Sequence, residues 1–184
     1  ALMIEVYPDN PPGGPSASGL IAALQKAKVT HCVTVPDFVQ FALHERIMAK
    51  DSGIANVFAC AENQALTLAT GLYIGGATTF VMMQNQGFLN CINTLRATCI
   101  DSAVPMVFLI GQHAREADNI GQPSTLSRRS MVRLMEPLMQ ALDIRFWNID
   151  EDTDIAASTA QAFEHAKVTK SAAVLLIGRH ITWN

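Results

Sequence analysis

Glu62 is the residue whose type and position in this sequence most clearly suggest chemistry. It directly follows an apolar run, Val57 to Ala61 (VFACA), and it opens a run of small residues typical of a helix. A carboxylate at this point would lie at the carboxyl end of a buried strand, which is the edge where open α/β sheets bind ligands. Acidic side chains are uncommon in apolar surroundings unless they are paired or functional.

Three further polar segments also follow predicted strands. Pro36-Asp37 follows the first strand, residues 84–93 (QNQGFLNCIN) follow the third, and residues 112–116 (QHARE) follow the fourth. If the sheet is parallel, all three lie at the same edge as Glu62. A ring of polar groups around one carboxylate is what a ligand pocket requires.

The elements that must position these residues alternate along the chain. Apolar, β-branched runs predict strands, and amphipathic runs between them predict helices. Several strands are apolar throughout, as expected when helices cover both faces of a sheet. We therefore expect an α/β fold with three α/β/α layers and a six-stranded, parallel, doubly wound sheet. The strands are expected at 29–35, 54–60, 78–83, 104–110, 144–149 and 172–177, and the helices at 16–28, 38–50, 62–74, 88–100, 127–142 and 152–166.

The composition suits a single globular domain and argues against several other classes. The chain has 184 residues, of which 49% are hydrophobic and 16% charged, and its formal net charge is −3. Residues 1–14 are rich in Pro and Gly and are expected to form an arm before one domain at 15–184. Without a Lys/Arg run, nucleic acid is not an expected partner. Apolar stretches fall short of the ~20 residues that span a membrane, so no membrane association is expected.

Absent motifs narrow the function further. The sequence lacks GxGxxG, GxxxxGK[ST] and GxSxG, which argues against common dinucleotide, P-loop and α/β-hydrolase sites. His44-Glu45 does not extend to HExxH, and the five histidines are scattered, so no metal site is predicted. The four cysteines lack CxxC spacing and lie in apolar segments, which favours free thiols in a reducing cytoplasm.

Two motifs in order resemble a known family. Ala65, Ala69 and Gly71 stand three, seven and nine residues after Glu62, a pattern that resembles the pyrimidine-binding (PYR) domain of thiamine-diphosphate-dependent enzymes. The run Gln84-Asn85-x-Gly87-x-x-Asn90-x-x-Asn93 and the segment 105–111 (PMVFLIG) look like the phosphonopyruvate and sulfopyruvate decarboxylase branch of that family. The resemblance covers residues 16 to 180, nearly the whole chain.

The resemblance implies roles for individual residues. In the family, the Glu at the position of Glu62 hydrogen-bonds N1′ of the cofactor's aminopyrimidine and so takes part in catalysis. Related decarboxylases place a proton-handling acid at the position of Asp37. The other expected cofactor-binding residues are Pro36, Gln84, Asn85, Gly87 and Asn90. Simpler alternatives remain for several of them: an N-cap for a helix starting at Phe38 (Asp37), a loop or helix cap (Asn85 and Asn90) and a plain turn (Gly87).

The loop after the fourth strand is the expected substrate contact. Relatives commonly have an Arg-Gly pair where this chain has His113-Ala114, and Arg115 follows. His113 and Arg115 could meet an anionic substrate, since Arg suits phosphonate, sulfonate and carboxylate groups. The alternative is a solvated loop.

The resemblance also implies a missing half. The family binds Mg²⁺ and the diphosphate through a Gly-Asp-Gly motif on a second domain, and this sequence contains no Gly-Asp-Gly. We therefore expect an alpha subunit that is inactive alone. Its beta subunit would bind Mg²⁺ and the diphosphate group of thiamine diphosphate. The two subunits would form a hetero-oligomer with PYR–PYR contacts.

The expected reaction is decarboxylation of a small anionic 2-oxo acid, such as sulfopyruvate or phosphonopyruvate. The alternatives are carboligation, another 2-oxo acid, or a non-catalytic assembly subunit. Retention of Glu62 argues against the last of these.

Overall fold

Six parallel strands form one sheet, which confirms the expected α/β class. The computed structural model describes residues 13–49, 52–150 and 155–184. The strand order is β2-β1-β3-β4-β6-β5, and every pairing is parallel. The strands are β1 (His31–Thr34), β2 (Ala55–Phe58), β3 (Thr79–Gln84), β4 (Met106–Gly111), β5 (Arg145–Ile149) and β6 (Ala172–Ile177). Since the strands are parallel, their carboxyl ends share one edge.

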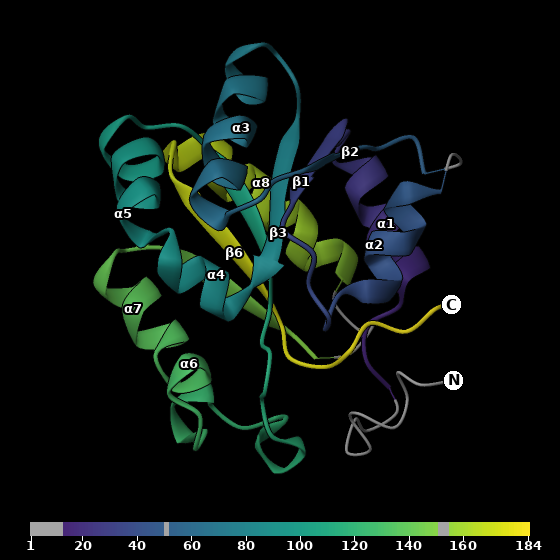
Figure 1. The fold of residues 1–184 in the computed structure, drawn as a ribbon, viewed down its shortest axis with the longest axis vertical. Helices are drawn as coiled ribbons and strands as arrows, with labels where there is room; N and C mark the ends of the chain where they lie inside the picture. The colour runs from purple at the N-terminus through teal and green to yellow at the C-terminus, as the bar shows by residue number, and fades with distance from the viewer. Residues whose placement is uncertain (1–12, 50–51, 151–154) are drawn as a thin grey trace.

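Helices cover both faces of the sheet (Figure 1). On one face lie α1 (Ala17–Lys26), α2 (Phe41–Met48) and α8 (Ile155–Thr169). On the other lie α3 (Glu62–Ile74), α4 (Asn85–Asn90), α5 (Ile92–Leu95) and α7 (Met135–Ala141). A π-helical turn (Arg96–Asp101) extends α5, α6 (Ser130–Arg133) precedes α7, and 3₁₀ turns lie at Ala117–Asn119 and Ser124–Leu126. This is the doubly wound, three-layer arrangement predicted from the sequence.

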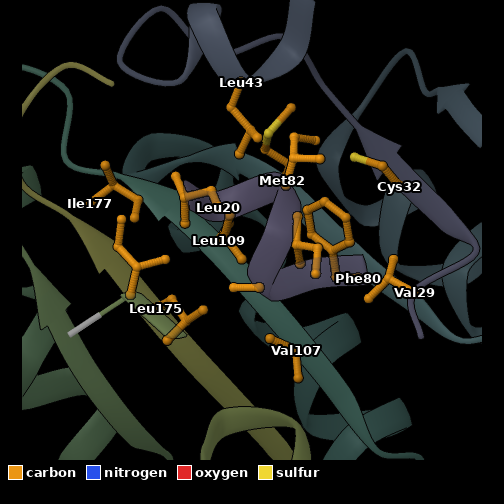
Figure 2. Close-up of a cluster of buried hydrophobic side chains, with 14 of the residues drawn as sticks. Leu20, Val29, Cys32, Leu43, Phe80, Met82, Val107, Leu109, Leu175 and Ile177 are labelled. Carbon is orange, nitrogen blue, oxygen red and sulfur yellow. The ribbon is translucent and has the colours of Figure 1, made fainter. Parts of the chain in front are cut away.

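The two cores follow from the twofold alternation of side chains along the central strands. Phe80 and Met82 of β3 pack towards α1, α2 and α8, together with Leu109 of β4 and Leu175 of β6 (Figure 2). Val81 of β3 and its alternating neighbours pack towards α3, α4 and α7. Both faces of each central strand are therefore buried, which is why these strands are apolar throughout.

Two predicted helices are wrong in detail. Instead of one helix over 88–100, α4 begins at Asn85, contains Gly87 and breaks at Cys91, and the π-helical turn follows α5. In that turn the Thr98 hydroxyl donates to the Thr94 carbonyl and the Ser102 hydroxyl donates to that of Ala97, so side chains compete for helix acceptors.

The helix expected over 127–142 is also divided, into α6 and α7. Pro137 lies in the first turn of α7, where its missing N–H is tolerated, but its ring opposes a continuous helix through Arg133. Residues 1–12 of the expected arm and residues 152–154 of the last helix lie outside the described residues.

The topological switch point of the sheet lies between β1 and β3. The chain leaves β1 for β2 on one side and continues to β3 on the other, so strand order reverses there. Ligands of open α/β sheets bind at the carboxyl ends of strands at such a point. The segments that follow β1, β2, β3 and β4 all lie at this edge, as expected from the sequence.

Two further observations concern membrane-spanning helices and the state of the cysteines. Within the described residues, no helix has both the length and the apolar character needed to cross a bilayer. All four cysteines are free: Cys32, Cys91 and Cys99 are buried, whereas Cys60 is exposed.

Ala114 adopts the left-handed backbone conformation, with φ of 62°. Gly adopts that conformation without steric cost. An L-residue pays about 1–2 kcal/mol there, partly offset by the lower conformational entropy of unfolded Ala relative to Gly.

We predict that Ala114→Gly raises the free energy of unfolding by about 0.5–1 kcal/mol, because it relieves this strain. Urea denaturation measures the change. Ala49→Gly is the matched control, because Ala49 has φ of −65° and should lose stability instead. A loss of stability in Ala114→Gly equal to that in Ala49→Gly would contradict the strain.

Candidate active site

Glu62 is the first residue of α3 and lies half-buried at the carboxyl edge of the sheet. Ala61 caps the helix in extended conformation without a side-chain hydrogen bond, so the start of α3 brings no side-chain partner of its own to Glu62. The carboxylate is held instead from α4, where Asn90 Nδ2 donates to Glu62 Oε2 at 3.3 Å. Two segments far apart in sequence therefore fix the direction of this side chain.

Gly87 is the residue that allows Glu62 to lie against α4. A Cβ built on Gly87 would stand 2.6 Å from Glu62 Oε1 and 2.7 Å from its Cδ, closer than real Cβ atoms approach. Gly87 is therefore needed here for close approach and not as a plain turn, because it lies inside α4.

One oxygen of Glu62 remains available to a ligand. Within the described part of the chain, Oε1 accepts no hydrogen bond, whereas Oε2 accepts one from Asn90. Behind the carboxylate, burial raises the pKa of the Cys91 thiol to about 12, and the negative charge of Glu62 adds to this shift. The Cys91 thiol is therefore protonated, and it forms part of the apolar wall next to Glu62.

Asp37 is buried in the loop after β1. Its Oδ1 accepts from the Val39 N–H at 2.9 Å and its Oδ2 from Gln40 Nε2 at 2.7 Å. The alternative of an N-cap for a helix starting at Phe38 is wrong, because α2 begins at Phe41. Burial raises the pKa of Asp37, while the bonds from Gln40 and Val39 and the positive charge of His113 oppose the rise.

Gly111, the last residue of β4, makes room for Asp37. A Cβ on Gly111 would overlap the Asp37 carboxylate, and it would also lie 2.9 Å from Val39 Cβ. The backbone of Gly111 also hydrogen-bonds this carboxylate. The loops after β1 and β4 thus meet in direct contact.

Gln40 joins three strand ends, a role that the sequence did not reveal. Its fully buried Nε2 donates to Asp37 Oδ2, to the Met83 carbonyl of β3 at 3.2 Å and to the Leu109 carbonyl of β4 at 3.1 Å. Its Oε1 has no hydrogen-bond partner in the described structure. A Gln three residues after a strand-end Asp was the available signal, but helix patterning masked it.

Asn85 and His113 are tied together. Asn85 is fully buried, and its Nδ2 donates to the His113 carbonyl at 3.1 Å and to the Met131 carbonyl at 3.3 Å. The Asn85 side chain therefore anchors the loop after β4 to the start of α4. The imidazole of His113 is half-buried, and its charge acts on Asp37.

Arg115 is directed into the protein. Its Nε donates to Asn119 Oδ1, its Nη1 to Gln112 Oε1 and Asp150 Oδ1, and its Nη2 to the carbonyls of Asn119 and Gln122. These bonds use all five N–H donors of a guanidinium. The Arg115 side chain is only 2% exposed, so it holds the loop after β4 to the end of β5.

The structure thus brings the candidate residues into two adjoining groups. The first group consists of Glu62, Gly87 and Asn90. The second group consists of Asp37 and His113. Asn85, at the start of α4, links that helix to His113. Pro36 is exposed beside Asp37, and Gln84 is half-buried at the end of β3.

Comparison with known proteins shows which family the fold belongs to. The profile described as "Thiamine pyrophosphate enzyme, N-terminal TPP binding domain" matches residues 16–144. The chain belongs to this family, as the pyrimidine-binding type of domain.

Two curated relatives are alpha subunits of sulfopyruvate decarboxylase. The protein from Methanothermobacter thermautotrophicus is 24% identical over 157 residues, covering 80% of this chain and 92% of the relative. The protein from Methanocaldococcus jannaschii is 26% identical over 99 residues, covering 54% of this chain and 56% of the relative.

Solved structures of thiamine-diphosphate enzymes share the fold. The 4-hydroxybenzoylformate decarboxylase of Rhodococcus jostii RHA1 superposes with a TM-score of 0.69 at 22% identity, over 89% of this chain and 30% of that one. The benzoylformate decarboxylase of Polynucleobacter necessarius gives a TM-score of 0.65 at 17% identity, over 88% and 29%. The chain spans less than a third of either enzyme.

We predict that Gly87→Ala weakens thiamine diphosphate binding by about 10-fold or more, because the new methyl group displaces the Glu62 carboxylate and its charged hydrogen bond. Calorimetric titration of the chain reconstituted with its partner measures the affinity. Gly75→Ala, at the other end of α3, is the matched control, since its added Cβ meets backbone only at 3.4 Å. Equal affinity in the two variants would show that the contact is unimportant.

We predict that Asp37 makes stability fall as pH rises above about 4. Because burial raises its pKa, the folded chain keeps this proton to higher pH than the unfolded chain, and unfolding becomes easier as the proton is lost. Urea denaturation across pH should therefore show wild type losing stability relative to Asp37→Asn as pH increases. Parallel curves for the two proteins would contradict the buried, proton-binding carboxyl group.

Proposed function

We propose that this chain is the pyrimidine-binding alpha subunit of a thiamine-diphosphate-dependent 2-oxo acid decarboxylase. The observation that carries the proposal is the Glu62 carboxylate, packed on Gly87 and hydrogen-bonded by Asn90 at the strand edge. Family membership supports the cofactor. The function of the two curated relatives supports sulfopyruvate, or a similar 3-substituted pyruvate such as phosphonopyruvate, as substrate.

The residues present fit the aminopyrimidine end of the cofactor. Glu62 Oε1 is available while Oε2 is held, so one oxygen can share a proton with N1′ while the other fixes the side chain. Gly87 and Asn90 act by orienting Glu62, and Gln84, Asn85 and Pro36 border the same edge. When bound, thiamine diphosphate supplies the electron sink for the carbanion left as CO₂ departs.

Asp37 is proposed to handle a proton near the substrate. Burial raises its pKa, so a larger fraction of this carboxyl group is protonated near neutral pH than for an ordinary Asp, and general acids work best with a pKa near the operating pH. Its hydrogen bonds from Val39 and Gln40 fix its position.

The proposal requires a second chain, a beta subunit that binds Mg²⁺ and the diphosphate. Exposed apolar side chains on and before α3 support such contacts, including PYR–PYR contacts: Phe58 is 55% exposed, Leu68 45% and Ile74 73%. Large exposed apolar groups on two successive elements, β2 and α3, favour a protein interface. The free cysteines support the reducing cytoplasm as the compartment of this assembly.

We predict that Glu62→Gln lowers the rate of CO₂ release by about 10²-fold or more, because Gln cannot exchange a proton with N1′. The assay uses the chain reconstituted with its beta subunit, thiamine diphosphate and Mg²⁺, with sulfopyruvate and phosphonopyruvate as substrates. Glu45→Gln, an exposed position on α2, is the matched control.

Full activity in Glu62→Gln would overturn the assigned role. Product analysis over a panel of 2-oxo acids separates decarboxylation from carboligation, which would yield a longer hydroxy ketone in place of an aldehyde. A purified complex without thiamine diphosphate would favour a non-catalytic assembly subunit.

A further inference from the structure

A cavity lies at the amino-terminal edge of the sheet, at the other end of the strands from Glu62. Its volume is about 530 Å³, and it is lined by the ends of α1 and α3, the starts of β3 and β4, and one side of α8. Thr79 at the start of β3 lines this cavity, whereas Gln84 at the end of β3 borders the candidate active site, roughly 17 Å further along the strand. The cavity therefore shares no residue with that site.

The inner surface of the cavity is apolar. Met106 and Val107 of β4 form its floor and are each only 2% exposed; Val107 is labelled in Figure 2. Ala23 of α1 and Ala160 of α8 leave space between the two helices, and the half-buried ring of Phe163 closes one side. A concave, largely apolar space of this volume is typical of sites for small molecules.

Three lysines stand around this apolar space. Lys26 lies in the last turn of α1, Lys28 follows that helix, and Lys167 lies in the last turn of α8. Within the described residues, none of the three ammonium groups forms an ion pair or a hydrogen bond. Glu164 is the one acidic residue among those that line the cavity. The rim is therefore positively charged, although the chain as a whole has a formal net charge of −3.

The helix dipole explains only part of this arrangement. The negative end of a helix favours a nearby cation, which accounts for lysine in the last turns of α1 and α8. It does not account for the meeting of three ammonium groups over one apolar space, with no carboxylate paired to them. Lysines in this arrangement can neutralise an acid group whose apolar part lies below them.

Backbone hydrogen bonds fix the walls of the cavity. The Thr30 N–H donates to the Thr78 carbonyl at 2.9 Å, which joins the segment after α1 to the start of β3. The Met106 N–H donates to the carbonyl of Ser171, just after α8, at 3.2 Å, which joins the end of that helix to the start of β4. Because the walls are held without a ligand, binding needs little ordering of the chain.

We propose that this cavity binds a small amphipathic anion, with one acid group such as a carboxylate or sulfonate and a short apolar chain. The apolar chain packs on Met106, Val107 and Phe163, and the acid group faces the three lysines. This inference goes beyond the decarboxylase function and does not depend on it.

Two features favour this ligand over others. A neutral apolar molecule leaves the lysines unused, and a cation is repelled by them. Because the lysines are exposed, each adds only modestly to affinity, so burial of the apolar chain supplies most of it. The ligand must therefore have both parts, and its charge decides between molecules of equal apolar size.

The first test titrates the full chain with octanoate and follows backbone amide signals by NMR. We expect saturation with a Kd of about 1 mM or tighter, with the largest shifts at Ala27, Thr78 and Ala160. Octan-1-ol should bind about fivefold more weakly or worse, and octylammonium more weakly still. Equal affinity for the three compounds, no saturation with octanoate, or shifts centred elsewhere would each overturn the inference.

Charge reversal tests the lysines. Lys28→Glu should weaken octanoate binding by about fivefold or more, because one attraction becomes a repulsion. Lys170→Glu is the matched control: Lys28 and Lys170 are both exposed, both follow a helix and have φ of 59° and 51°, but only Lys28 lines the cavity. Lys170→Glu should change the Kd less than about twofold. Equal effects of the two changes would contradict a charge-reading site.

Filling the cavity tests its position. Ala160→Trp should abolish binding of both octanoate and octan-1-ol, whereas Ala157→Trp, at an exposed position of α8 that does not line the cavity, should leave both unchanged. Circular dichroism checks that both variants are folded. Unaltered binding in folded Ala160→Trp would overturn the inference.

The same titration on the chain reconstituted with its beta subunit tests the alternative occupant. Octanoate should still bind with a similar Kd. Loss of binding there would show that the partner protein covers the cavity and would overturn the inference. None of these readouts uses CO₂ release, so their failure leaves the proposed decarboxylase function standing.

Discussion

The contact between Glu62 and Gly87 is the constraint on which the candidate site depends. It joins the first turn of α3 to the first turn of α4, and it exists only because Gly87 has no side chain. Asn90, one turn further along α4, then holds one carboxylate oxygen. The same helix therefore provides both the space for Glu62 and its hydrogen bond, and any movement of α4 changes the direction of the carboxylate.

Gln40 keeps the neighbouring part of the edge in place. One buried amide joins the loop after β1 to the ends of β3 and β4, and α4 begins directly after β3. A change in the position of Asp37 is therefore transmitted to the strand ends that set the start of α4. Arg115 has a comparable role further along, where its buried pair with Asp150 ties the loop after β4 to the end of β5.

Much of the fold could be predicted because its signals are local. The strands are apolar runs, and α3 begins at Glu62 and ends at Ile74 as expected, because an apolar strand precedes it and Gly75 follows it. The π-helical turn after α5 was missed, since the Thr98 and Ser102 hydroxyls compete for helix acceptors only in the folded chain.

The site was predictable only as a set of strand ends. Glu62, Asp37 and His113 could be proposed as site residues because each follows a predicted strand. Gln40 could not be proposed, because its role depends on carbonyls of β3 and β4. Such a role arises from contacts between distant parts of the chain. The same holds for Arg115. It is a good anion ligand by residue type, but its N–H donors all bond to groups of the protein itself.

The most direct test of the central claim is a crystal structure of this chain with its beta subunit, thiamine diphosphate and Mg²⁺. The account predicts Glu62 Oε1 within about 2.6–3.0 Å of N1′ of the aminopyrimidine, the range of a strong hydrogen bond, with Oε2 still held by Asn90. An aminopyrimidine bound away from α3 and α4, or a Glu62 carboxylate directed elsewhere, would contradict it.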